Sequence, residues 1–152
     1  MVHFHCYSFD SIDKIQWYRI LQLRQEIFVV EQNCPYLDLD NRDFDAYHLV
    51  GSNVENQIQT YCRILPPGIA YQDYCSIGRV LTAAEFRKQK LGKSLMQEAI
   101  FYCNKLFPKY PIKISAQSYL LDFYSNLGFV ATGKSYLEDG IPHDEMIYSI
   151  HN

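Results

Sequence analysis

Apolar residues in the first part of the chain recur at helical spacing. From Ser11 to about Val30 the pattern predicts one amphipathic helix, with Ile12, Ile15, Ile20, Leu23, Ile27 and Phe28 on its apolar face. Asp10 or Ser11 would cap its N-terminus. Pro35 and several acidic residues then interrupt the periodicity, so residues 33–45 are predicted to form a loop.

Strand patterns and a second helix follow. Strands are predicted over Ala46–Ser52 and Gln57–Leu65, joined by a hairpin turn at Asn53–Asn56. The mostly apolar segment Cys75–Thr82 predicts a third strand in the centre of a sheet. A long amphipathic helix is predicted from about Lys90 to Phe107, with one apolar face made of Leu91, Leu95, Met96, Ala99, Ile100, Cys103 and Leu106.

The last quarter returns to short elements. We expect a strand at Ile112–Ala116 and a short helix at Tyr119–Asn126 that ends on Gly128. A hairpin of Phe129–Tyr136 with Met146–Ile150 would close the chain. The sum is an α+β fold, in which an antiparallel run of strands precedes a strand–helix–strand unit.

Composition narrows the class of protein. At 152 residues with 48% hydrophobic content, the chain suits a single domain spanning residues 1–152 and is not disordered. A formal charge of -3 gives no global reason to expect nucleic acid or an anionic membrane as a partner. No stretch reads as a signal peptide or a membrane span. The five cysteines are scattered, which predicts free thiols in a reducing cytoplasm and no metal site.

The most informative segment is a short basic loop that joins a buried strand to the start of a helix. The helix N-terminus offers unpaired backbone N–H groups and a partial positive charge, both of which favour phosphate. The loop adds cationic side chains, and Gly92 permits close approach of a ligand to the backbone. Neither nucleotide-binding glycine motif is present. Taken alone, these charges also suit an ordinary solvated basic face at a helix start.

This segment resembles motif A of the GNAT superfamily of acetyltransferases, in which a strand leads into Arg/Gln-x-x-Gly-x-Gly/Ala at a helix start. Matched from the strand, the sequence has Arg87-x-x-Lys90-x-Gly92. Lys90 stands in place of the family's middle glycine, a departure that bears on one backbone contact and adds a positive charge. A shifted match, Gln89-x-x-Gly92-x-Ser94, lies at a less suitable distance from the strand.

Further blocks in the same order resemble the ElaA-type branch. They cover residues 23–36, the pair Ala116-Gln117, residues 123–129 and residues 138–143. The resemblance implies the GNAT acyl-CoA N-acyltransferase fold, a mixed and mostly antiparallel sheet flanked by helices. It also implies acetyl-CoA as co-substrate, a small-molecule or peptide amine as acceptor, and a possible homodimer.

By the same analogy, the pantetheine arm of the donor would pair with backbone groups of Val80, Leu81 and Thr82, as an added strand does. Its pyrophosphate would lie on the turn formed by Arg87, Lys88, Gln89, Lys90, Leu91, Gly92 and Lys93. Gln117 matches a position at which the family often has an asparagine that contacts the cofactor. Val80 and Leu81 also suit plain core packing.

The resemblance suggests residues for proton transfer as well. Tyr124, just before Gly128-Phe129, matches the tyrosine that often protonates the CoA thiolate, although a half-buried core tyrosine is the alternative. The general base is more open. Glu31 ranks first, because burial at an apolar helix end would raise its pKa, and a surface glutamate is the other interpretation. His143 ranks second and could instead cap a hairpin.

Three other features of the sequence are considered for a chemical role: a cysteine, a histidine and an acidic stretch. Cys34 lacks an evident base partner, so a covalent acetyl-cysteine route is rejected. His48 lies within a strand and is interpreted as a core histidine. The acidic stretch Asp38, Asp40, Asp43 and Asp45 is expected to be a solvated loop, with attraction of a cationic amine as the alternative.

The sequence therefore favours direct acetyl transfer from acetyl-CoA to a primary amine. Two alternatives remain. One is a non-catalytic CoA-binding or regulatory module of the same fold, and the other is an interaction protein that uses the acidic loop.

Overall fold

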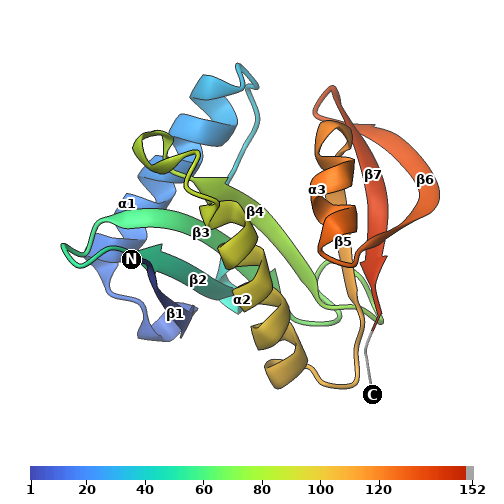
Figure 1. The fold of residues 1–152 in the computed structure, drawn as a ribbon, viewed down its shortest axis with the longest axis horizontal. Helices are drawn as coiled ribbons and strands as arrows, with labels where there is room; N and C mark the ends of the chain where they lie inside the picture. Colours follow the sequence, from blue (N-terminus) through green and yellow to red (C-terminus); the bar gives the residue numbers. More distant parts are fainter. Residues whose placement is uncertain (150–152) are drawn as a thin grey trace.

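Two antiparallel sheets, with strand orders β1-β2-β3-β4 and β5-β7-β6, make up the framework of residues 1–149, the part of the chain that the computed structural model describes (Figure 1). The strands are β1 His3–Ser8, β2 Tyr47–Ser52, β3 Ile58–Leu65, β4 Ser76–Thr82, β5 Ile112–Gln117, β6 Val130–Glu138 and β7 Ile141–Tyr148. The α-helices are α1 Lys14–Arg24, α2 Leu91–Leu106 and α3 Leu121–Asn126.

Within residues 1–149, strand pairing between the two sheets occurs at one end of β4 and β5. Cys75 and Ile112 form a parallel bridge, in which Cys75 N donates to Pro111 O at 3.2 Å and Lys113 N donates to Cys75 O at 2.9 Å. Beyond this bridge β4 and β5 diverge (Figure 1). The prediction of a central strand is therefore wrong over most of β4, which pairs with β3 on one edge and, among the described strands, has no partner along most of the other. Its apolar residues are explained by helices that cover both of its faces.

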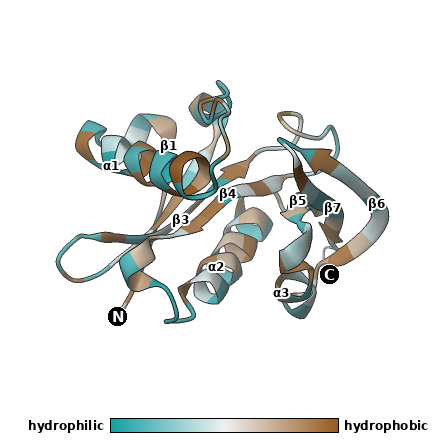
Figure 2. Cartoon of the chain, turned by 90° about the horizontal axis from the view of Figure 1, so that it is seen from above, coloured by the Kyte–Doolittle hydropathy of each residue, from teal (hydrophilic) through white to brown (hydrophobic). Residues whose placement is uncertain are grey.

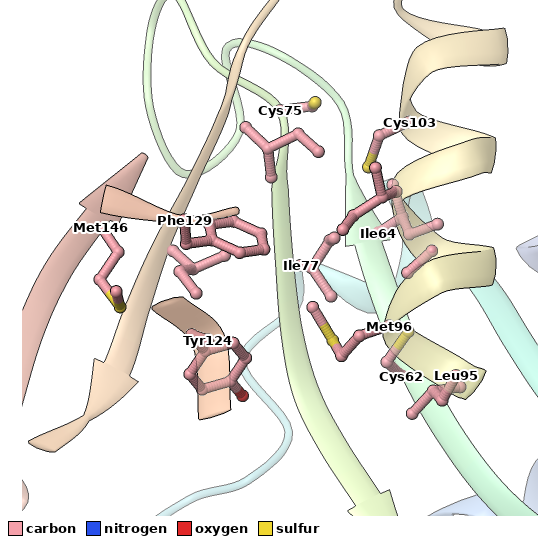
Figure 3. Packing of buried hydrophobic residues seen from close by; sticks show 14 of the residues in the cluster. Cys62, Ile64, Cys75, Ile77, Leu95, Met96, Cys103, Tyr124, Phe129 and Met146 are labelled. Atoms are coloured by element: carbon pink, nitrogen blue, oxygen red, sulfur yellow. The ribbon is translucent and has the colours of Figure 1, made fainter. Parts of the chain in front are cut away.

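Helices α1 and α2 cover opposite faces of the first sheet (Figure 2). On one face, Ile77 of β4 packs in a cluster with Leu95 and Met96 of α2. On the other face, Leu81 of β4 packs with Ile20 of α1. The larger cluster continues past β4 to the second sheet, where Figure 3 shows Tyr124, Phe129 and Met146. The two sheets thus share one core although they share almost no strand pairing.

A β-bulge explains how Ile77 and Leu81 can face opposite helices. Residues four apart on a regular strand lie on the same face. In β4, however, Gly78 pairs with Arg63 while Leu81 pairs with Tyr61, so one extra residue is inserted opposite β3. Arg79 within the bulge has a φ of 50°. The insertion shifts the register by one and turns the following side chains to the other face.

The N-terminal third departs most from the prediction. The helix begins at Lys14, where Asp13 Oδ1 accepts from Gln16 N at 2.9 Å, because Asp10 and Ser11 belong to a separate 3-10 turn. From Gln25 to Glu31 the chain continues as a π-helix. Strand β1 was not predicted, although His3–Ser8 has the alternating burial of a half-exposed edge strand.

The C-terminal hairpin is tighter than predicted. Asp139 and Gly140 alone connect β6 to β7, with φ values of 51° and 78°. Two successive left-handed residues give the turn whose twist matches that of antiparallel strands, so pairing extends to Glu138 and Ile141. Ile150, the predicted end of the last strand, lies outside the described residues.

The acidic stretch is not a solvated loop. Asp43 is 5% exposed, and three arginines from three different elements contact this stretch. Arg24 at the end of α1 binds Asp38 at 2.8 Å and Asp43 at 2.7 Å. The corrected interpretation is a structural ion network of Asp38, Asp40 and Asp43, whose carboxylates are paired with arginines, whereas Asp45 is exposed.

The other two arginines tie the same segment to the sheet. Arg63 of β3 binds Asp40 at 2.6 Å and Asp43 at 3.1 Å, and Arg79 in the bulge of β4 binds Asp38 at 2.7 Å. Burial raises the pKa of Asp43, but hydrogen bonds and charge from Arg24 and Arg63 outweigh it and hold the pKa below its ordinary value. The network therefore contains ionised carboxylates that match buried guanidinium groups.

We expect Asp43→Asn to lower the free energy of unfolding by about 3 kcal/mol, because Arg24 and Arg63 would keep their buried charges and lose a shared partner. The matched control is Asp45→Asn at an exposed carboxylate of the same segment, for which a change within about 0.5 kcal/mol is expected. Urea denaturation measures both. Equal effects of the two substitutions would contradict the structural role of the network.

Candidate functional site

The divergence of β4 and β5 opens a cleft with a cavity of about 530 Å³. Residues 78–82 of β4 form one wall, and Ser115 and Gln117 of β5 lie on the other. The π-helix contributes Ile27, Phe28 and Glu31, and the β6–β7 hairpin contributes Glu138 and His143. Segments from both ends of the chain thus converge on one space.

The wall formed by β4 offers its main chain to a ligand. Because β5 has separated from β4 at this level, the backbone groups on that edge have no strand partner. An extended ligand with amide groups can pair with such an edge as an added strand would. Val80, Leu81 and Thr82, the residues predicted for this contact, all line the cavity.

A second cavity of about 570 Å³ lies at the basic turn. Most residues of the predicted turn line it, namely Arg87, Lys88, Lys90, Leu91, Gly92 and Lys93, whereas Gln89 is exposed outside its lining. No side chain caps the N-terminus of α2, so its first N–H groups remain available to an anion. Thr82 and Arg87 line both cavities and mark their junction.

The backbone at Lys90 explains the departure from the glycine pattern. Lys90 is the N-cap residue of α2 with φ 59° and ψ 25°, which is the left-handed region. This conformation costs a residue with a Cβ about 1–2 kcal/mol, and glycine adopts it freely. The turn therefore keeps a shape that suits glycine while it places one more cation at the cavity.

Arg87 and Glu31 form an ion pair across the cleft. Arg87 Nη1 lies 2.7 Å from Glu31 Oε1, and Nη2 donates to Oε2 at 3.0 Å. The expectation that burial would raise the pKa of Glu31 is wrong. Its side chain is 46% exposed, and the hydrogen bond from Arg87 lowers its pKa. Glu31 is accordingly a carboxylate with a cationic partner.

Tyr124 enters the cleft from α3. Its ring packs edge-on against Phe123 and Phe129, and the residue is 7% exposed. Figure 3 shows the hydroxyl directed away from Phe129, on the side of β4. Burial raises the pKa of this phenol above its ordinary value. Tyr124 therefore holds its proton firmly and can act as a donor through neutral pH.

His143 faces the cavity from β7, opposite Gln117 of β5 in the register. Its Nδ1 lies 2.7 Å from Ile141 O. A carbonyl oxygen only accepts, so Nδ1 carries the hydrogen and Nε2 is the atom that can exchange a proton. Glu138 Oε2 lies 3.3 Å from Nε2. Glu138, which was not among the predicted site residues, thus belongs with His143.

His48 and Cys34, which were also considered for a chemical role, have contacts that do not support one. His48 is fully buried between Tyr61, whose hydroxyl lies 2.8 Å from Nδ1, and Asp43 O, which confirms a core histidine. Cys34 lines the cleft and its thiol contacts Asp139 O at 3.7 Å. Within residues 1–149 no cluster of metal-binding side chains is present, and no helix is long and apolar enough to cross a membrane.

Sequence reasoning missed the arginines of the ion network and the bulge at Arg79. The signal was present, because Arg63 and Arg79 lie in segments that read as buried strands. A buried arginine requires carboxylate partners, and the acidic stretch upstream supplies them.

The two sheets diverge beyond the parallel bridge of β4 and β5, and the free edge of β4 lies beside the basic start of α2. This arrangement defines the fold of acyl-CoA-dependent N-acyltransferases. Comparison with known proteins agrees. Residues 39–150 match the family model described as an acetyltransferase (GNAT) domain. The chain is 36% identical over 145 residues to protein ElaA of Escherichia coli, covering 94% of each chain.

Solved structures give the same result. The crystal structure of Escherichia coli ElaA superposes with a TM-score of 0.90 at 34% identity, covering 98% of this chain and 100% of the other. An acyl-CoA N-acyltransferase from Pseudomonas aeruginosa has a TM-score of 0.90 at 36% identity with the same coverage. This chain belongs to the GNAT family, in the branch of ElaA. The predicted family and fold class are thereby confirmed.

The left-handed backbone at Lys90 leads to a stability prediction. Lys90→Gly should raise the free energy of unfolding by about 0.5–1 kcal/mol, since relief of the left-handed cost exceeds the greater entropy of glycine in the unfolded chain. Lys93→Gly, inside the first turn of α2, should lower it by up to about 1 kcal/mol. Thermal or urea unfolding measures the pair. A loss of stability in both variants would contradict the strain assigned to Lys90.

Proposed function

We propose that this protein transfers the acetyl group of acetyl-CoA directly to a primary amine of a small molecule or peptide. The observation that carries the proposal is that the cavity at the basic turn and the cleft that contains Tyr124 share Thr82 and Arg87 in their linings. Family membership supports acyl transfer from a CoA donor. The acetyl group and the amine are the parts that this proposal adds.

The residues present suit such a donor. The pyrophosphate would take the N–H groups at the start of α2 together with Arg87, Lys88, Lys90 and Lys93. The pantetheine amides would pair with the free edge of β4 at Val80, Leu81 and Thr82. Gln117, on the opposite wall, would offer an amide to the donor. Of these groups, Arg87 and the carbonyl of Thr82 already have partners within the free chain, namely Glu31 for Arg87 and Arg87 Nε for Thr82 O.

The reaction requires two proton transfers. The amine nitrogen attacks the thioester carbon, a C–N bond forms and the C–S bond breaks. Tyr124 would give its proton to the departing thiolate and recover one from solvent. The amine must lose a proton to a base, for which the cleft offers Glu31 and the pair of His143 with Glu138.

The proposal is tested by an acceptor screen with acetyl-CoA that covers polyamines, amino acids, aminoglycosides and peptide amines, with release of free CoA thiol as the readout. We expect at least one amine to be acetylated, with the product identified by mass spectrometry. Thermal stabilisation by acetyl-CoA is expected in parallel. Absence of both stabilisation and turnover across the panel would contradict the proposed function.

Tyr124→Phe should lower kcat by about 100-fold, because general acids contribute on the order of 10²–10⁴ and the thiolate would have to leave unprotonated or by way of water. The affinity for CoA should remain within about twofold. Tyr119→Phe is the matched control, since Tyr119 lines the same cavity and is 75% exposed. An unchanged rate for Tyr124→Phe over the whole pH range would rule out the acid role.

A further inference from the structure

Arg87 already has partners for all of its guanidinium nitrogens. Nη1 and Nη2 bind the two carboxylate oxygens of Glu31 at 2.7 and 3.0 Å, and Nε donates to Thr82 O at 3.3 Å. Arg87 and Thr82 are also the residues shared by the two cavities. In the free protein, therefore, a cation and a backbone acceptor assigned to the donor are occupied by other groups of the chain.

This arrangement is reversible. The side chains of Arg87 and Glu31 are 40% and 46% exposed, so water screens their attraction and the pair adds little stability. A pyrophosphate carries more negative charge and more acceptor oxygens than one carboxylate, so it is the stronger partner for a guanidinium group. Exchange of Glu31 for pyrophosphate at Arg87 is consequently favourable.

We infer that the ion pair of Glu31 and Arg87 is a latch at the junction of the two cavities, which the donor opens by taking over Arg87 and which leaves Glu31 unpaired on the wall of the cleft. This inference rests on the proposed function and adds its regulation. Donor binding thus makes the Glu31 carboxylate available to the acceptor side.

The position of Glu31 gives the latch a consequence for the acceptor. Glu31 ends the π-helix, whose residues Ile27 and Phe28 line the cleft. Once Arg87 has turned to the pyrophosphate, the negative charge of Glu31 attracts the ammonium form of an amine. Donor and amine then favour each other's binding, and this coupling is reciprocal.

The test measures the affinity for CoA alone by titration calorimetry at low salt. Glu31→Gln should tighten CoA binding by about two- to fivefold, since the donor no longer competes for Arg87. Glu85→Gln is the matched control, because Glu85 is an exposed carboxylate two residues from Arg87 in the 3-10 turn Ala84–Phe86. It should change the affinity clearly less than Glu31→Gln does.

A double-mutant cycle separates the latch from general repulsion between Glu31 and the phosphates. In an Arg87→Gln background, Glu31→Gln should leave CoA affinity unchanged, because its effect passes through Arg87. The latch is overturned if Glu31→Gln does not tighten binding, if Glu85→Gln tightens it equally, or if the tightening persists without Arg87. Failure of the unsubstituted protein to bind CoA would instead overturn the proposed function. Circular dichroism verifies that each variant is folded.

Discussion

The rest of the structure depends on the match between three arginines, of which Arg24 and Arg63 are buried and Arg79 is partly buried, and three aspartates. Arg24, Arg63 and Arg79 come from α1, β3 and the bulge of β4, and the residues 38–43 supply every carboxylate that they contact. A guanidinium group that is shielded from water must find anionic partners, since an unpaired buried charge is strongly destabilising. The loop is therefore held over β3 and β4, and the end of α1 is held at the same point.

Two features of the site follow from this constraint. The bulge that carries Arg79 shifts the register of β4 against β3, so that Leu81 packs towards α1. The π-helix begins directly after Arg24 and ends at Glu31, which places that carboxylate within reach of Arg87. Interactions that stabilise the fold thus also set the spacing between the cleft and the basic turn.

Local pattern predicted the repetitive elements well and the irregular ones poorly. The α2 helix, β2, β3 and β5 lie within a residue or two of their predicted bounds, because each has a hydrophobic pattern over several residues and turn or loop residues at its ends. The α1–π-helix boundary, the bulge and the ion network depend on partners distant in sequence, which periodicity does not contain. Glu31 illustrates the limit. Its apolar neighbours suggested burial, whereas its actual environment is set by Arg87, 56 residues further along the chain.

The same pairings limit how the cleft can accept a proton. While Arg87 hydrogen-bonds Glu31, it stabilises the carboxylate and makes Glu31 a weaker base. His143 is constrained differently, because its Nδ1 lies 2.7 Å from Ile141 O and its Nε2 lies 3.3 Å from Glu138 Oε2. The two candidates therefore respond to different events. The basicity of Glu31 depends on whether Arg87 pairs with it or with another group on the donor side of the cleft. His143 is oriented by Ile141 and Glu138 of its own hairpin, and neither contact involves the donor. For the proposed reaction, this independence is an argument for His143 with Glu138 as the proton acceptor and for Glu31 as the group that would attract the amine.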